Sequence, residues 1–222
     1  MNLKQFNQLS SDLQSLAKII PLNWGAIQND KTDNNLDMFA IHTFIELENK
    51  ISLFPEPSKT YFRRRWFLWK CAQCDEYLFN LNGNVSQNPN QKSQTYDIEF
   101  NSDLELRFDV KGTVIPRNFR DKINLMMDDP SEMIRFFYDN QSKGIRNGIQ
   151  NRLFIIHHSY KNEAREMYLR CHWDLKKEIY KSYASQITRT SNFVNYKEVK
   201  ADVIFIFENA DHTFTPHFYG IR

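Results

Sequence analysis

Residues 95–116 read TYDIEFNSDLELRFDVKGTVIP. Apolar and polar residues alternate along this segment, with the period of two that sends successive strand side chains to opposite faces of a sheet. The pattern predicts two adjacent strands, with Asp97 on the first and with Asp109 and Lys111 on the polar face of the second. An Asp on one hairpin strand and an Asp-x-Lys on the next supply the residue types of a divalent-metal nuclease site.

Length and composition indicate one ordinary globular domain. The chain has 222 residues, of which 41% are hydrophobic and 14% aromatic, so it can bury a substantial core. Lys and Arg number 29 against 27 Asp and Glu, a net charge of +2 that neither requires nor excludes a nucleic-acid partner. The three Cys come without a secretory signal and argue against a disulfide framework. No apolar run reaches the roughly 20 residues of a membrane span, so we expect a cytoplasmic protein without membrane contact.

Hydrophobic periodicity and turn residues predict the remaining elements. Residues 59–79 lack a clean period, and we expect a helix there, followed by a short strand near residues 77–81. Residues 82–94 are rich in Asn, Gln and Ser and predict a surface loop. Taken together, the elements predict an α/β fold with a mixed central sheet flanked by helices. The other predicted elements are helices at residues 3–19, 33–51, 131–141 and 163–187, and strands at residues 153–156 and 202–207.

The pattern acidic-x-Lys occurs four times, and the expected secondary structure discriminates among the copies. Residues two apart on a helix point in nearly opposite directions, whereas on a strand they share a face. This excludes the two copies in predicted helices and leaves Asp109 with Lys111 and Glu198 with Lys200. Of these two, the first has an acidic strand residue, Asp97, a hairpin's length upstream. We therefore place the candidate site at the first.

Phosphodiester hydrolysis requires chemistry that these residue types could provide. A hard cation such as Mg²⁺ or Mn²⁺ prefers carboxylate and carbonyl oxygens, and we expect Asp97, Asp109 and the main-chain carbonyl of Val110 as ligands. Such an ion polarises the phosphate and lowers the pKa of a bound water. Lys111 would stabilise the developing negative charge, and Glu46 in the helix predicted at residues 33–51 is expected to add a further catalytic carboxylate.

These residues resemble the PD-(D/E)xK nuclease superfamily, the fold of type II restriction endonucleases. Tyr96 and Asp97 stand where the family has Pro-Asp, and FDVKGT stands where it has the (D/E)xK strand. The resemblance covers about residues 33–160 and implies a core of helix, three strands, helix and strand. Within a single domain of residues 1–222, a helical segment at residues 1–32 would precede this core, and a helix and strands at residues 161–222 would follow it. The resemblance further implies Mg²⁺-dependent cleavage of DNA, in restriction, repair or phage defence.

A nuclease needs cations and amides around its metal to hold the nucleic acid. Arg63 and Arg64 lie among aromatic residues that could stack on bases, and Gln150 is of a type that reads base edges. Gly112, directly after Lys111, would let the substrate backbone approach. The residues do not distinguish DNA from RNA. Further candidate contacts follow the proposed site in the sequence: Arg117, Arg120, Arg146 and Arg152.

Two further groups of residues favour structural roles. Cys71, Cys74 and Cys171 with His172 have part of the spacing of a zinc site, but buried thiols are the commoner outcome and structural zinc is not expected. His157 and His158 are adjacent on a predicted strand, so they face opposite sides and cannot both bind one ion. We expect one of them at the edge of the core and the other in solvent.

Three functions stay open at this point. The first is a Mg²⁺-dependent endodeoxyribonuclease, with a symmetric homodimer as the arrangement that would cut both strands of a palindromic target. A second is a non-catalytic nucleic-acid-binding or protein-interaction module on the same fold. The third is a structural factor whose polar strand faces only contact water. The intact set of Asp97, Asp109 and Lys111 favours the first, because a degenerate relative would be expected to lose at least one of them.

Overall fold

The computed structural model describes residues 1–20, 35–90, 95–141 and 150–221, except for the side chains of Gln141 and Ala164. In these residues a mixed sheet carries helices on both faces, so the predicted α/β class is confirmed. The helices are α1 (Leu3–Leu16), α2 (Phe44–Ile51), α3 (Glu56–Asn80), α4 (Ile123–Asp128), α5 (Ser131–Gln141), α6 (Glu166–Leu169) and α7 (Trp173–Ala184), and short 3-10 turns lie at Met38–Ala40, Leu104–Leu106, Arg117–Lys122 and Glu163–Arg165.

Seven strands form the sheet in the order β1-β2-β3-β4-β6-β5, and β7 also pairs with β6. The first three form an antiparallel meander, whereas β3, β4 and β6 run parallel to one another. β5 and β7 are both antiparallel to β6. The strand bounds are β1 (Val85–Gln87), β2 (Ile98–Phe100), β3 (Arg107–Val114), β4 (Arg152–Ser159), β5 (Val194–Tyr196), β6 (Val199–Glu208) and β7 (Phe214–Phe218).

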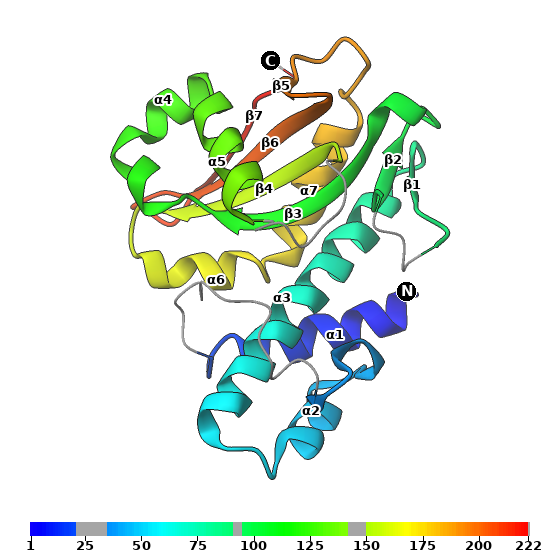
Figure 1. Ribbon diagram of the computed structural model, residues 1–222, viewed down its shortest axis with the longest axis vertical. Helices are drawn as coiled ribbons and strands as arrows, with labels where there is room; N and C mark the ends of the chain where they lie inside the picture. Colours follow the sequence, from blue (N-terminus) through cyan, green and yellow to red (C-terminus); the bar gives the residue numbers. More distant parts are fainter. Residues whose placement is uncertain (21–34, 91–94, 142–149, 222) are drawn as a thin grey trace.

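The core consists of two apolar layers, one on each face of the sheet. Leu153 and Ile155 of β4 pack with residues of α1, α3 and α7, whereas Phe154 and Ile156 pack with residues of α4 and α5. Figure 1 shows this arrangement, with α4 and α5 on one side of the sheet and α3 and α7 on the other. Every residue of β4 is buried, as expected for a central parallel strand that is covered on both faces.

Helix α3 is longer than predicted and replaces the strand expected near residues 77–81. Its buried surface continues through Tyr77, Leu78 and Phe79, and the ring of Phe79 stacks on Tyr180 of α7 at 4.0 Å between centroids. This packing outweighs the strand preference of the aromatic residues, because propensity is weak against tertiary contacts. The first strand, β1, instead lies at Val85–Gln87, inside the segment predicted to be a loop.

Local capping explains two of three further differences from the predicted elements. The helix expected at residues 33–51 begins only at Phe44 in its described part, because the Thr43 hydroxyl caps it by accepting from the Glu46 N–H. The strand expected from residue 104 begins at Arg107, since Asp103 caps a 3-10 turn that leaves Leu104 exposed. The helix expected at residues 163–187 is interrupted between α6 and α7, where the chain turns at residues 170–172. The helix predicted at residues 131–141 is confirmed as α5.

A fully buried ion pair joins helices α3 and α7 beneath the sheet. Lys176 of α7 is paired with Asp75 of α3, and both side chains are 0% exposed. Tyr180 also donates to this carboxylate at 2.8 Å, and the Lys176 ammonium donates to the carbonyl of Arg170 at 3.2 Å. Desolvating two charges is costly, so removing one partner leaves the other uncompensated inside the core.

We predict that Lys176→Met lowers the free energy of unfolding by about 3–5 kcal/mol, because the Asp75 charge then stays buried without its partner. Urea denaturation followed by circular dichroism measures this change. Adding Asp75→Asn in the same chain is expected to recover part of the loss, since the amide carbonyl still accepts from Tyr180. Lys181→Met, on the exposed side of the same helix, is the control and should change stability by less than about 0.5 kcal/mol. A loss no larger for Lys176→Met than for this control would contradict the buried-pair account.

Candidate active site

The candidate site lies at the edge of β3 where β2 begins. The pairing of these two strands includes Ile98 opposite Phe108, and the N–H of Asp97 donates to the carbonyl of Phe108 at 2.9 Å. Two residues further along β3, the N–H of Val110 donates to Oδ2 of Asp97 at 2.8 Å. The side chain of Asp97 thus continues the ladder in place of a strand. N–H and C=O of one strand residue point to the same edge, so the Val110 carbonyl also faces this side.

Asp109 lies beside Asp97 and contacts a cation through each carboxylate oxygen. Lys111 Nζ lies 2.5 Å from Asp109 Oδ1, and Arg152 Nε lies 3.5 Å from Asp109 Oδ2. Lys111 is two residues further along β3, whereas Arg152 is the residue directly opposite Asp109 on the parallel strand β4. The structure therefore brings together the predicted Asp97, Asp109 and Lys111, and it adds Arg152 to them.

This cluster is not a water-exposed sheet face. Asp109 is only 5% exposed, and the Lys111 side chain is 29% exposed, so one charge is buried and the other reaches solvent. Arg152 is 3% exposed. Charged groups are rarely buried unless they are paired, because the loss of hydration must be offset. A polar face that only meets water would not bury Asp109 and Arg152 together.

Helix α3 contributes a carboxyl group that the sequence argument missed. Glu76, near the end of this helix, is half-buried and interacts electrostatically with Asp97, Lys111 and Asp109. Glu76 could have been found from its place near the end of the helix that directly precedes the three antiparallel strands. Residues 77–81 were expected to form a strand, and that expectation hid the helical register of Glu76.

Burial and the nearby carboxyl groups raise two pKa values at the site. Burial, followed by the negative charge of Asp97, raises the pKa of Glu76 to about 8, although Lys111 acts in the opposite direction. Burial and then the charge of Asp109 raise the pKa of Asp97 to about 6, against the influence of Lys111 and of the Val110 N–H. Such shifts are typical of groups held close to like charges, and they are common at functional sites.

Glu46, predicted as the further carboxylate, lies elsewhere. It belongs to α2, which packs against α1 and α3, and Figure 1 shows α2 at the end of α3 remote from β1 and β2. Its carboxylate accepts from the main-chain N–H of His42 at 2.9 Å. The prediction for Glu46 is therefore wrong, because the helix preceding the strands is α3 rather than the predicted helix at residues 33–51.

The oxygen donors at the site suit a hard divalent cation that takes only a few of its ligands from the protein. Among the described residues, no group of three or more His, Cys, Asp and Glu side chains is arranged to hold a metal ion. Mg²⁺ is commonly bound through one or two carboxylates and keeps several waters. Asp97 and Asp109 could provide two carboxylates, and the Val110 carbonyl lies on the same strand edge. These residues fit Mg²⁺ or Mn²⁺ better than a softer metal, since all the donors are oxygen.

Three of the arginines predicted to contact nucleic acid are engaged within the protein. Arg63 pairs with Glu48 at 2.7 Å and with Glu56 at 3.0 Å. Arg120 donates to both carboxylate oxygens of Glu166, at 3.0 and 2.8 Å. Arg152 is buried beside Asp109. Intramolecular carboxylates already neutralise these guanidinium groups, so we withdraw the three as phosphate contacts.

The remaining residues predicted to contact nucleic acid differ in their exposure to solvent. Arg117 is exposed in the turn that follows β3, and Arg64 is half-buried with its guanidinium 5.9 Å from the Tyr61 ring centroid. Gln150 is half-buried just before β4, and its carbonyl accepts from the hydroxyl of Tyr138 at 2.9 Å. Arg146 lies outside the described residues. Arg117 and Arg64 stay predictions as nucleic-acid contacts, as does Gln150.

Gly112 does not open a path for a substrate. A Cβ atom on this residue would lie 2.3 Å from the guanidinium of Arg170, which is itself 3% exposed. The glycine is therefore needed for close packing of a buried Arg against β3, on the face opposite to Asp109 and Lys111. The expectation of a substrate approach at Gly112 is wrong for this reason.

The cysteines and the adjacent histidines all face the interior. Cys71, Cys74 and Cys171 are free thiols and buried, and burial raises the pKa of Cys74. His157 and His158 are 0% and 7% exposed, so the expectation that one of them faces solvent is wrong. Apolar layers cover β4 on both faces, and successive side chains of the strand point into opposite layers. Adjacent histidines on this strand are therefore both buried.

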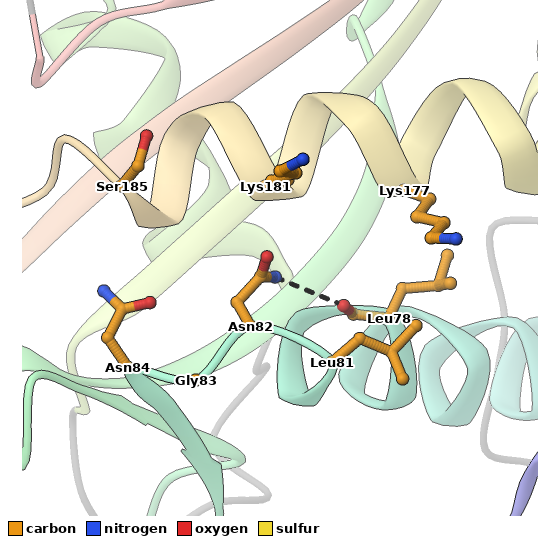
Figure 2. A pocket seen from close by; sticks show the side chains of 8 residues that line it. All are labelled: Leu78, Leu81, Asn82, Gly83, Asn84, Lys177, Lys181 and Ser185. Carbon is orange, nitrogen blue, oxygen red and sulfur yellow. Dashed lines mark hydrogen bonds between the residues drawn. The ribbon is translucent and has the colours of Figure 1, made fainter.

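A surface depression between α3 and α7 has different chemistry from the carboxylate cluster. Its volume is about 420 Å³, and Figure 2 shows its lining from the end of α3, the following turn and one side of α7. The lining contains no carboxylate, so it offers no hard-cation site. Its residues are Leu78, Leu81, Asn82, Gly83, Asn84, Lys177, Lys181 and Ser185.

We predict that Glu76→Gln stabilises the metal-free protein. A pKa raised from 4.5 to about 8 means that the folded chain retains a proton that the unfolded chain loses, so wild-type stability falls as the pH rises from about 4.5 to 8. The neutral amide avoids this loss. Its gain should be near zero at pH 4 and grow to the order of 1 kcal/mol at pH 8.

Urea denaturation in EDTA at pH 4, 6 and 8 measures the effect of Glu76→Gln. Glu99→Gln is the matched control, because Glu99 forms an ion pair with Arg107 at 2.5 Å and its replacement should not stabilise the fold. A pH-independent effect of Glu76→Gln would show that the pKa of Glu76 is not raised in the folded protein.

Comparison with known proteins adds no relative to this description: no family model, no curated protein and no solved structure matches the chain. Within the described residues, none of the helices has the length and apolar character to cross a membrane.

Proposed function

We propose that this chain is a metal-dependent endodeoxyribonuclease that hydrolyses DNA phosphodiester bonds. The observation that carries the proposal is the hydrogen bond that fixes Asp97 beside Val110, which puts two carboxylates and the Lys111 ammonium at one strand edge. Burial of Asp109 distinguishes this arrangement from an ordinary polar strand.

The order of elements supports a restriction-endonuclease-like core. Helix α3 precedes the antiparallel meander of β1, β2 and β3, and α5 then leads into β4, which lies parallel to β3. This is the sequence of helix, three strands, helix and strand that the resemblance implies. The first candidate aspartate directly precedes β2 and the second lies on β3, in line with the arrangement that the resemblance implies.

The chemistry divides between a cation and the chain's own residues. A divalent cation, when bound, would polarise the scissile phosphate and acidify a water. Asp97 and Asp109 would hold that cation, with the Val110 carbonyl as a further oxygen donor. Lys111 is half-exposed, so its ammonium can turn from Asp109 towards a phosphate and stabilise the charge that develops there. Glu76 keeps a third carboxyl group facing these residues.

Binding of DNA would depend on cations near the site that are still accessible. Arg117, in the turn directly after β3, is the exposed candidate closest in sequence to Lys111. Each phosphate that such a residue neutralises adds affinity that falls with salt concentration. A symmetric homodimer would let two such sites cut opposite strands of a palindromic target.

We predict that Asp109→Ala and Lys111→Ala each reduce Mg²⁺-dependent cleavage of plasmid DNA by roughly 100-fold or more, because each removes a group that acts on the reacting phosphate. Loss of supercoiled plasmid on an agarose gel measures the rate. Circular dichroism spectra and melting curves establish that each variant is folded.

Lys200→Ala is the matched control, since Lys200 ends the second strand copy of the acidic-x-Lys pattern and pairs with Glu105 instead of a site residue. This variant should cleave as the wild type does. Equal cleavage by Lys111→Ala and wild type would overturn the assignment. A wild type that binds DNA in gel shifts but never cleaves it would support the non-catalytic alternative instead.

A further inference from the structure

Arg152 is a buried cation for which the proposed chemistry has no use. It lies opposite Asp109 in the register of β3 and β4, 3.5 Å from Asp109 Oδ2, and it is 3% exposed. A residue so enclosed cannot serve as a surface contact for a phosphate. The carboxylate of Asp109 is one of the two that the proposed nuclease site requires.

The neighbourhood of Arg152 holds its guanidinium in place. The guanidinium carbon lies 4.6 Å from the ring centroid of Tyr138, on α5, in cation–π geometry. That ring is itself stacked on Tyr196 of β5, at 4.6 Å and with an angle of 3° between the planes. Tyr138 also donates to the carbonyl of Gln150, two residues before Arg152. Two aromatic rings and a main-chain hydrogen bond therefore fix Arg152 beside Asp109.

Each oxygen of Asp109 thus faces a positive charge, Lys111 at Oδ1 and Arg152 at Oδ2. A divalent cation would also need an oxygen of this carboxylate. Lys111 is half-exposed and can leave, whereas Arg152 is enclosed and stays near the ion. Two positive charges that share one carboxylate repel each other, and the repulsion is strong where water is excluded.

We propose that Arg152 is a positioning residue that holds Asp109 in place in the metal-free protein and, by its charge, weakens binding of the divalent cation. The inference rests on the proposed nuclease function, because it assigns the cation to Asp109. Without Arg152, Asp109 would lose the positive charge beside Oδ2 and keep Lys111 at Oδ1. The residue therefore stabilises the empty site at the expense of metal affinity.

The nature of the side chain fits this role. An Arg remains charged at every accessible pH, is weakly hydrated and stacks on aromatic rings, so it tolerates burial better than Lys does. The ion pair of Arg152 with Asp109, at 3.5 Å, is longer than the paired hydrogen bonds that Arg120 makes with Glu166.

Isothermal titration of the metal-free protein with Mn²⁺, without DNA, tests the inference. We expect Arg152→Met to bind Mn²⁺ roughly tenfold more tightly than the wild type, because one positive charge near the ion is gone. Arg152→Gln, which is neutral and polar, should also bind Mn²⁺ roughly tenfold more tightly than the wild type. It replaces Arg152→Met if that variant does not fold. Arg152→Lys keeps the charge and should bind with nearly the wild-type affinity. In EDTA, both neutral variants should melt at a lower temperature than the wild type.

Arg165→Met is the control, since Arg165 pairs with Glu208 at the other end of the parallel strands. Along β4, Arg152 lies opposite Ala201 and Ser159 opposite Glu208, a separation of about 20 Å. This variant loses an ion pair but should bind Mn²⁺ as the wild type does. Tighter binding in the control would overturn the inference, as would unchanged or weaker binding in both neutral Arg152 variants. A wild type that binds no Mn²⁺ would instead overturn the proposed function, and the inference with it.

Discussion

The site depends on one hydrogen bond, from the N–H of Val110 to the carboxylate of Asp97. In a sheet, this N–H would normally pair with a carbonyl of the neighbouring strand. Because β2 begins only at Ile98, a side chain takes that place, and it comes from the residue just before the strand. The constraint turns an ordinary strand end into a point where two carboxylates from different strands lie together. Lys111 and Arg152 then have a defined partner, because Asp109 cannot move without disturbing β3.

The fold accepts a concentration of negative charge at this edge because the surrounding layers are rigid. Every residue of β4 is buried, and apolar clusters cover both faces of the sheet. Next to Glu76 in the sequence, Asp75 forms a buried pair with Lys176 that ties α3 to α7. Successive residues on a helix point about 100° apart, so one residue can anchor α3 while the next faces the site. Functional sites commonly keep such unfavourable groupings, and the remainder of the fold compensates for them.

The predictable part of this protein is the part that depends on local periodicity. Alternation with a period of two identified Asp97, Asp109 and Lys111, because residues two apart on a strand must share a face. The roles of Glu76 and Arg152 depend on contacts that have no local signature. To place Glu76 at the site, one must know that α3 extends to Asn80. Aromatic packing, and not the sequence pattern, determines that extension. To place Arg152 beside Asp109, one must know the register of the parallel strands β3 and β4. No local pattern in the sequence indicates how residues so far apart in the chain are paired. Glu46 is predicted as a catalytic carboxylate because of its place in a helix before the strands. That helix, α2, packs against α1 and α3 instead.

The opposite end of the same strands contains a charge cluster in which cations surround one buried carboxylate. Glu208, at the end of β6, accepts from Ser159 at 2.7 Å, pairs with Arg165 at 2.5 Å and lies 3.2 Å from His212. Burial alone would raise its pKa, yet the contacts with Arg165, Ser159 and His212 outweigh burial and lower it to about 2. At the candidate site the pKa values of Glu76 and Asp97 move upward instead. At both ends an Arg pairs with a buried carboxylate, so residue type does not distinguish the two clusters. The difference is the ratio of carboxylates to cations, and an excess of carboxylates is the condition under which a divalent cation would be bound.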